Sequence, residues 1–103
     1  MRIVARRTLR RFVETRAGRK DRGALASALE AWFDEVRKAS WRNTADVKRR
    51  YASASIVTAE RIVFNIKGND YRLVARIQYQ AGVVEVRFFG THAEYDQIDA
   101  DTV

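Results

Sequence analysis

The sequence contains no cysteine and no proline, and only five of its 103 residues are glycine. The absence of cysteine excludes disulfide bonds, thiolate nucleophiles and cysteine-based zinc sites. The scarcity of proline and glycine argues against long disordered segments. The opening residues, MRIVARRTLRRF, hold arginines but no apolar run of the length that a secretory signal or a membrane span needs. We therefore expect one domain over residues 1–103, with no membrane partner and a cytoplasmic location.

Basic residues outnumber acidic ones by seven, and the excess lies near the N-terminus. Residues 1–22 hold nine arginines or lysines against Glu14 and Asp21, whereas residues 94–103 carry a net charge of −4. A cationic surface favours a polyanionic partner, most often nucleic acid, through counterion release. A solvated basic helix face would give the same composition, so the charge leaves both interpretations open.

Hydrophobic spacing predicts helices in the first half of the chain, after a short β-prone segment at residues 1–5 that could form an edge strand. A basic amphipathic helix is predicted over residues 8–16, followed by an exposed loop over 17–23. The next helix is predicted from one continuous apolar stripe, which consists of Leu25, Leu29, Trp32, Phe33 and Val36. Asn43 and Asp46 then predict the N-terminal cap of a short helix over residues 45–51.

After Tyr51 the apolar period changes from 3.6 to 2, which predicts three strands over residues 61–66, 71–79 and 83–89. The connections are short and contain Gly68-Asn69 and Gly82, which are expected to supply the positive φ angles of tight antiparallel hairpins.

The alternation assigns each strand residue to one of two faces of the sheet. One face is apolar and requires the helices as cover; it is expected to hold Ile62, Phe64, Ile66, Tyr71, Leu73, Ala75, Ile77, Tyr79, Val84, Val86 and Phe88. The other face is expected to hold Asn65, Arg72, Val74, Arg76, Gln78, Glu85, Arg87 and Phe89. Three arginines on neighbouring strands repel one another and suggest a bound anion, although Glu85 could neutralise one of them.

The stretch GTHAEYDQIDA follows the last predicted strand and holds the single histidine. Thr91 and Glu94 have the spacing of a capping box, so a helix is expected to begin here. His92 would lie in its first turn, where unpaired N–H groups favour an anion and a neutral imidazole. His92 is therefore a candidate base beside a phosphate; the alternative is a solvated bystander in a short terminal helix.

These groups suit metal-independent cleavage of RNA, in which a base takes the 2′-OH proton, cations stabilise the phosphorane and an acid protonates the leaving oxygen. His92 and Tyr95 are the natural proton carriers. Asp96 could orient His92 or serve as an acid or base itself, although the spacing i, i+4 on one helix is also that of ordinary surface pairing. No cofactor is expected, and carboxylates with metal-ligand spacing are not evident. The candidate catalytic residues are Arg72, Arg87, His92, Tyr95 and Asp96. The candidate RNA-binding residues are Lys48, Arg49, Asn65, Lys67, Asn69, Arg76 and Phe89.

The runs RIVFNIKGNDYRLVARIQY and FFGTHAEYDQID resemble the HigB toxin family of bacterial type II toxin–antitoxin systems, within the RelE-like group. The resemblance implies an α+β, RelE-like fold with N-terminal helices packed on one face of a twisted antiparallel sheet and a short C-terminal helix. It also implies a ribosome-dependent endoribonuclease that cleaves mRNA. The partner of the toxin would be a HigA-like antitoxin with a helix-turn-helix domain. The toxin would bind operator DNA only through this antitoxin.

Two other functions stay open: a ParE-like gyrase poison with the same architecture, and a non-catalytic RNA-binding module. Asp99 and Asp101 are also expected to draw the C-terminus toward the protein's own basic surface and limit nonspecific RNA binding.

Overall fold

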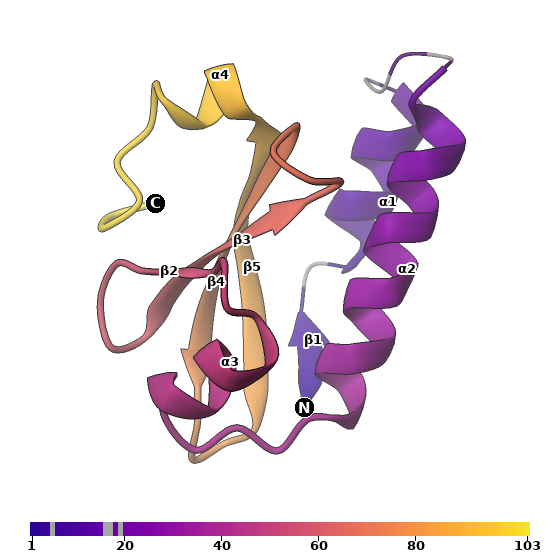
Figure 1. Ribbon diagram of the computed structural model, residues 1–103. Helices are drawn as coiled ribbons and strands as arrows, with labels where there is room; N and C mark the ends of the chain where they lie inside the picture. The colour runs from indigo at the N-terminus through magenta and orange to yellow at the C-terminus, as the bar shows by residue number, and fades with distance from the viewer. Residues whose placement is uncertain (5, 16–17, 19) are drawn as a thin grey trace.

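The computed structural model describes residues 1–4, 6–15, 18 and 20–103. It is an α+β fold with a five-stranded sheet in the order β1-β5-β4-β3-β2 (Figure 1). The elements are β1 (Arg2–Val4), α1 (Arg6–Thr15), α2 (Arg22–Lys38), α3 (Thr44–Arg50), β2 (Ser55–Ile56), β3 (Arg61–Ile66), β4 (Tyr71–Gln78), β5 (Val83–Thr91) and α4 (His92–Tyr95). The sheet is mixed, because β1 pairs with β5 in parallel while the other pairs are antiparallel.

The predicted elements are confirmed in type, with shifted ends. The edge strand, the first helix and the loop over 17–23 each include residues among 5, 16, 17 and 19, which lie outside the described residues. The short strand β2 was not predicted, since two exposed residues carry no period.

The core lies between the sheet and the helices α1 and α2, which cover one face of it (Figure 1). The whole predicted stripe of α2 is buried, and α1 contributes Leu9, Phe12 and Val13. Aromatic rings join the layers: Trp32 packs against Phe64 with ring centroids 5.4 Å apart, and Phe12 packs edge-on against Phe89 at 4.8 Å. Burial of each such side chain contributes roughly 1.5–3 kcal/mol to folding.

A β-bulge in β5 corrects the predicted faces. Val86 lies opposite Ala75 and Phe88 opposite Val74, so Arg87 is the extra residue and the alternation shifts by one. Phe89, which was expected on the arginine face, is only 8% exposed and stacks on Tyr71 in the core. Phe88, which was expected in the core, instead lies on the opposite face of the sheet. This face also carries Arg72 and Arg76 and is called here the outer face. The prediction that Phe89 offers a surface for a nucleotide base was therefore wrong.

The β3–β4 turn also differs from its prediction in one residue. Gly68 and Gly82 have positive φ as expected. In the β3–β4 turn, however, the residue that shares the positive φ with Gly68 is Lys67, with φ of 54°, and not Asn69. The left-handed region is unusual for a lysine. Its side chain bonds to Asp70 at 2.8 Å and to Asp21 at 3.3 Å, which ties the turn to the N-terminus of α2.

Candidate functional site

The capping box of Thr91 and Glu94 begins the short helix α4 in the way the sequence predicts. The Thr91 side chain accepts a hydrogen bond from the Glu94 amide at 3.2 Å, and the Glu94 carboxylate accepts one from the Thr91 amide at 3.0 Å. The His92 amide donates to the Asp70 carbonyl at 3.1 Å. The capping box and this bond together hold α4 against the β3–β4 turn.

The imidazole of His92 is accessible at this end of the sheet. Its side chain is 54% exposed, and Nε2 lies 3.6 Å from a carboxylate oxygen of Asp96, one helical turn later. A contact of this length is an ion pair when the imidazole is protonated and is longer than a hydrogen bond. Asp96 therefore lies where it can orient the His92 ring, which is one of the roles that the sequence leaves open for it.

Arg72 lies on β4 beside the same turn. Its guanidinium donates to the carbonyl oxygens of Asn69 at 2.9 Å and Tyr71 at 3.2 Å. Within the described part of the chain, no carboxylate forms an ion pair with it. Backbone acceptors thus fix the position of the Arg72 side chain while its charge stays available to an anion.

Phe88 and Tyr95 form the aromatic surface of the site. Their ring centroids are 6.5 Å apart and their planes are tilted by 51°. Gly90 permits this arrangement, because a Cβ at this position would lie 2.8 Å from the Phe88 ring and 3.1 Å from the Glu94 carboxylate. The sequence carried one sign of Phe88's role: two adjacent phenylalanines break the alternation of a strand, as a bulge does.

The other two arginines of the predicted cluster have acidic neighbours. Arg76 pairs with Glu60 at 3.1 Å and Arg87 pairs with Glu85 at 3.0 Å, and each arginine side chain is 39% exposed. Partly exposed pairs of this kind contribute roughly 0–1 kcal/mol. They neutralise part of the arginine cluster, as the structural interpretation of Glu85 predicted, but a phosphate can compete with them.

The predicted residues of the short helix α3 are engaged elsewhere. Lys48 donates to the carbonyl oxygens of Ala52 and Ala54 at 2.6 and 2.7 Å, which terminates the helix. Arg49 pairs with Asp46. No contact among the described residues joins either side chain to the histidine end of the sheet.

The β3–β4 turn carries the remaining predicted residues. Lys67 is held by Asp70 and Asp21, and these carboxylates raise its pKa. Burial and the nearby Asp21 raise the pKa of the Tyr71 hydroxyl. Asn69 is exposed, and the Asn65 amide donates weakly to the Ser53 carbonyl at 3.4 Å.

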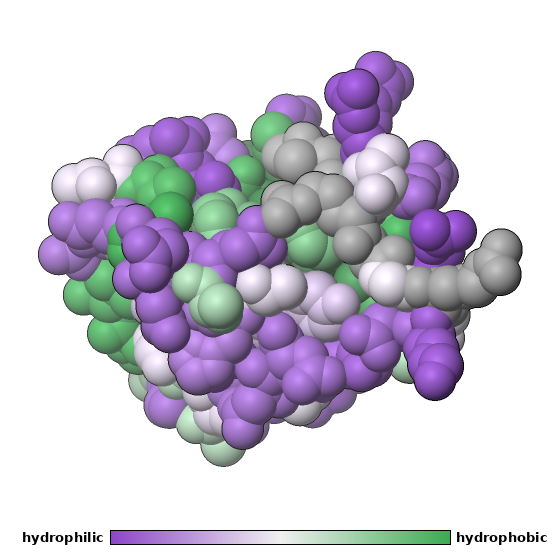
Figure 2. Space-filling model, turned by 90° about the horizontal axis from the view of Figure 1, so that it is seen from above, coloured by the Kyte–Doolittle hydropathy of each residue, from purple (hydrophilic) through white to green (hydrophobic). Residues whose placement is uncertain are grey.

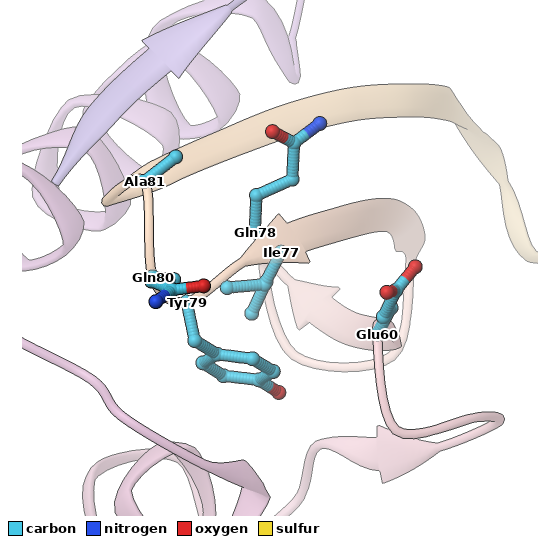
Figure 3. A pocket seen from close by; sticks show the side chains of 6 residues that line it. All are labelled: Glu60, Ile77, Gln78, Tyr79, Gln80 and Ala81. Carbon is cyan, nitrogen blue, oxygen red and sulfur yellow. The ribbon is translucent and has the colours of Figure 1, made fainter.

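Figure 2 looks down on the end of the molecule that carries α4, and hydrophilic residues dominate this surface, with apolar patches between them. A surface hollow lies elsewhere on the molecule. It has a volume of about 580 Å³ and is formed at the β4–β5 hairpin by Glu60, Ile77, Gln78, Tyr79, Gln80 and Ala81 (Figure 3). Its one carboxylate, Glu60, pairs with Arg76, and the Tyr79 hydroxyl donates to the Ala59 carbonyl. This hollow holds none of the predicted catalytic residues.

Among the described residues, none of the helices is long and apolar enough to cross a membrane. In the same part of the chain, no three histidine, aspartate or glutamate side chains gather as a metal site requires.

The α+β architecture with its five-stranded mixed sheet agrees with a RelE-like fold. The family model for HigB toxins, described as the RelE-like toxic component of a toxin–antitoxin system, matches residues 25–98. The chain therefore belongs to the HigB toxin family, and it is the toxin of a toxin–antitoxin pair. Such a toxin implies an antitoxin partner. A comparison with curated proteins finds no match.

Proposed function

We propose that this toxin is an endoribonuclease that cleaves mRNA on the translating ribosome. The observation that carries the proposal is the pairing of His92 with Arg72 at one end of the sheet. An exposed imidazole lies in a capped helix that is bonded to the β3–β4 turn, and the Arg72 guanidinium is bonded to backbone carbonyls of the same turn.

The reaction needs no metal. One of the pair His92 and Tyr95 removes the proton from the ribose 2′-OH, and the other protonates the leaving 5′ oxygen. Arg72 stabilises the charge of the phosphorane, and Arg87, the other predicted catalytic arginine, holds the RNA backbone beside it. Asp96 orients His92, and the products are a 2′,3′-cyclic phosphate and a 5′-hydroxyl. DNA is spared, because it lacks the nucleophile.

RNA binding follows the outer face of the sheet. Phe88 replaces Phe89 as the aromatic surface for a base, beside Tyr95. Arg76, Asn65 and Asn69 contact the backbone or a base. Lys48, Arg49 and Lys67 contribute positive charge near the RNA path while their bonds within the protein fix the short helix and the turn.

The partners follow from this function. The ribosome presents the mRNA, and a HigA-like antitoxin with a helix-turn-helix domain covers or distorts the site and binds operator DNA on behalf of the complex. The location is the cytoplasm, where the substrate is translated.

The test is to incubate the purified protein with an mRNA, with and without translating ribosomes, and to map the ends of the products. Cleavage only with ribosomes, leaving 2′,3′-cyclic or 3′-phosphate ends, is the expected result. Intact mRNA in both reactions would contradict the proposal, and a DNA supercoiling assay would then separate a gyrase poison from a non-catalytic RNA-binding module.

A further inference from the structure

A fourth arginine, Arg61, lies on the outer face of the sheet. Arg61 of β3 is the cross-strand neighbour of Arg76 of β4, so the two side chains leave the sheet on the same side. Like charges directly opposite one another destabilise a sheet. This cost is tolerated where an anion or an acceptor lies between the two cations.

The arginines of this face differ in their partners. Arg76 and Arg87 each pair with a glutamate, but within the described residues no aspartate or glutamate pairs with Arg61. Its guanidinium instead donates to the main-chain oxygen of the terminal residue Val103, from Nε at 3.4 Å and from Nη2 at 3.3 Å. Nε of Arg87 donates to the same oxygen at 3.3 Å. Two guanidinium groups, from strands on either side of β4, thus converge on one oxygen atom.

We propose that Arg61 and Arg87 form a second phosphate subsite for RNA, and that the segment 97–103 occupies this subsite in the free protein. The terminal main-chain oxygen of Val103 stands in for a phosphate oxygen. This inference rests on the proposed function and adds to it a binding position that is separate from the residues around His92.

The register of the sheet places the second subsite along the path of the RNA. Arg72, at the histidine end, and Arg76, beside Arg61, are four residues apart on β4, which corresponds to roughly 13 Å along the strand. Between these two positions lies Phe88, the partly exposed cross-strand neighbour of the buried Val74. A single strand that lies along this face has cations at both ends and an aromatic surface between them, which is the arrangement that single-stranded nucleic acid requires.

The segment 97–103 is held by weak bonds that a phosphate can replace. It runs along the side of the sheet opposite α1 and α2 (Figure 1). Its own turn is closed at Asp99, whose carbonyl oxygen accepts from the amides of Thr102 at 3.2 Å and Val103 at 3.0 Å. Asp99 and Asp101 are exposed and make no ion pair among the described residues, so the contact with the basic surface is made by the backbone and not by the two carboxylates as expected. The three hydrogen bonds from Arg61 and Arg87 to Val103 are 3.3–3.4 Å long, which is longer than usual for N–H···O bonds, so a phosphate that makes shorter charge-assisted bonds can displace the segment.

The experiment measures binding of a fluorescent single-stranded RNA whose riboses are all 2′-O-methylated and which therefore cannot be cleaved by 2′-OH attack. Fluorescence anisotropy over a range of salt concentrations gives the affinity and its salt slope. The variant is Arg61→Gln, and its matched control is Arg37→Gln, an exposed arginine of α2 that pairs with Asp34. We expect Arg61→Gln to bind roughly fivefold more weakly, with a salt slope lower by about 0.7 for the lost phosphate contact. Arg37→Gln is expected to keep the wild-type slope.

Deletion of residues 99–103 gives the second measurement. The shortened protein is expected to bind the RNA severalfold more tightly than the full chain, and Arg61→Gln is expected to remove most of that gain. Equal affinity and slope for Arg61→Gln and Arg37→Gln would overturn the subsite, as would a full chain that does not bind the RNA.

The subsite and the proposed catalysis can fail separately. Binding that depends on Arg61 without cleavage of mRNA on ribosomes would remove the catalysis and leave the subsite. Cleavage of mRNA together with an RNA affinity that does not change in Arg61→Gln would remove the subsite and leave the catalysis.

Discussion

At the scale of single residues, the site depends on His92 more than on any other side chain. It is the one histidine of the chain, and helix capping and a backbone bond to Asp70 fix its place. A side chain that is 54% exposed and contributes nothing to the core can be replaced without loss of stability. Replacement of the His92 side chain is therefore expected to change catalysis without changing the stability of the fold.

We expect His92→Ala to lower the single-turnover cleavage rate by about 10²–10⁴-fold, the usual contribution of a positioned acid or base. The melting temperature should stay within a few degrees of the wild type. Asp96→Asn is the companion variant, with a smaller loss, because Asp96 acts on the RNA only through His92. Normal cleavage by a folded His92→Ala protein would remove His92 from the mechanism.

Two glycines offer a matched pair of substitutions. A Cβ at Gly90 would lie 2.8 Å from the Phe88 ring, whereas a Cβ at Gly23 would meet nothing within 4 Å. We expect Gly90→Ala to destabilise the protein by roughly 1–3 kcal/mol through overpacking, and to weaken RNA binding because Phe88 must move. Gly23→Ala, in the helix α2, should instead stabilise it by about 0.4–1 kcal/mol. Denaturant unfolding measures both changes in stability. An unchanged unfolding free energy for Gly90→Ala would show that Gly90 does not confine the Phe88 ring.

At the scale of the elements, the sequence predicted each helix and each long strand, because those elements carry clear apolar periods. The stripe of α2 and the capping box at Thr91 needed no tertiary information. The bulge at Arg87 and the strand β2 could not be found in this way. A bulge is selected by how the strand fits its neighbours and the layer beneath, where Phe89 fills a place between Phe12 and Tyr71.

The residues of the proposed site divide in the same way, into those whose position follows from local structure and those whose position depends on distant contacts. Arg72, His92 and Asp96 could be predicted, since each is placed by local structure whose signal lies in nearby residues. Arg61 could not, because its partner in the free protein, Val103, is 42 residues away in the sequence. Lys48 and Lys67 were predicted to bind RNA from their charge alone, and their structural bonds depend on contacts that periodicity does not reveal.

The β3–β4 turn gives a prediction about pH. The carboxylates of Asp70 and Asp21 raise the pKa of Lys67 above its ordinary value, so the folded protein holds this proton more tightly than the unfolded chain. The stabilisation is therefore complete below the unfolded pKa of about 10.4 and is lost as the pH rises through the folded pKa. We expect Lys67→Met to be less stable than the wild type at pH 7–9, and the difference in unfolding free energy to shrink above pH 10.5. A difference that does not change between pH 8 and pH 11 would contradict the role of the lysine charge.

At the scale of the whole molecule, the positive charge lies on two separate surfaces. The outer face carries the arginines of the proposed site, whereas the helix α1 covers the opposite face of the sheet and bears exposed arginines of its own. Because the sheet separates the arginines of α1 from the proposed site, we expect them not to stabilise the proposed reaction directly. Their effect on a polyanion as large as the ribosome is long-range attraction, which salt screens with a Debye length of about 8–10 Å under physiological conditions.

Because the positive charge lies on two surfaces, substitutions on each surface should change different kinetic parameters of cleavage. Replacement of Arg7, Arg10 and Arg11 by glutamine should lower kcat/KM for ribosome-bound mRNA severalfold at low salt and leave kcat unchanged, because association slows while the chemistry does not. The loss should disappear as the salt concentration rises, since screening removes the attraction from the wild type as well. Arg72→Ala is the contrasting variant, and its lower kcat should persist at every salt concentration, because the lost hydrogen bonds act in the transition state. If the triple variant instead lowers kcat at high salt, α1 contacts the substrate directly, and the RNA path extends around the edge of the sheet to the helical face.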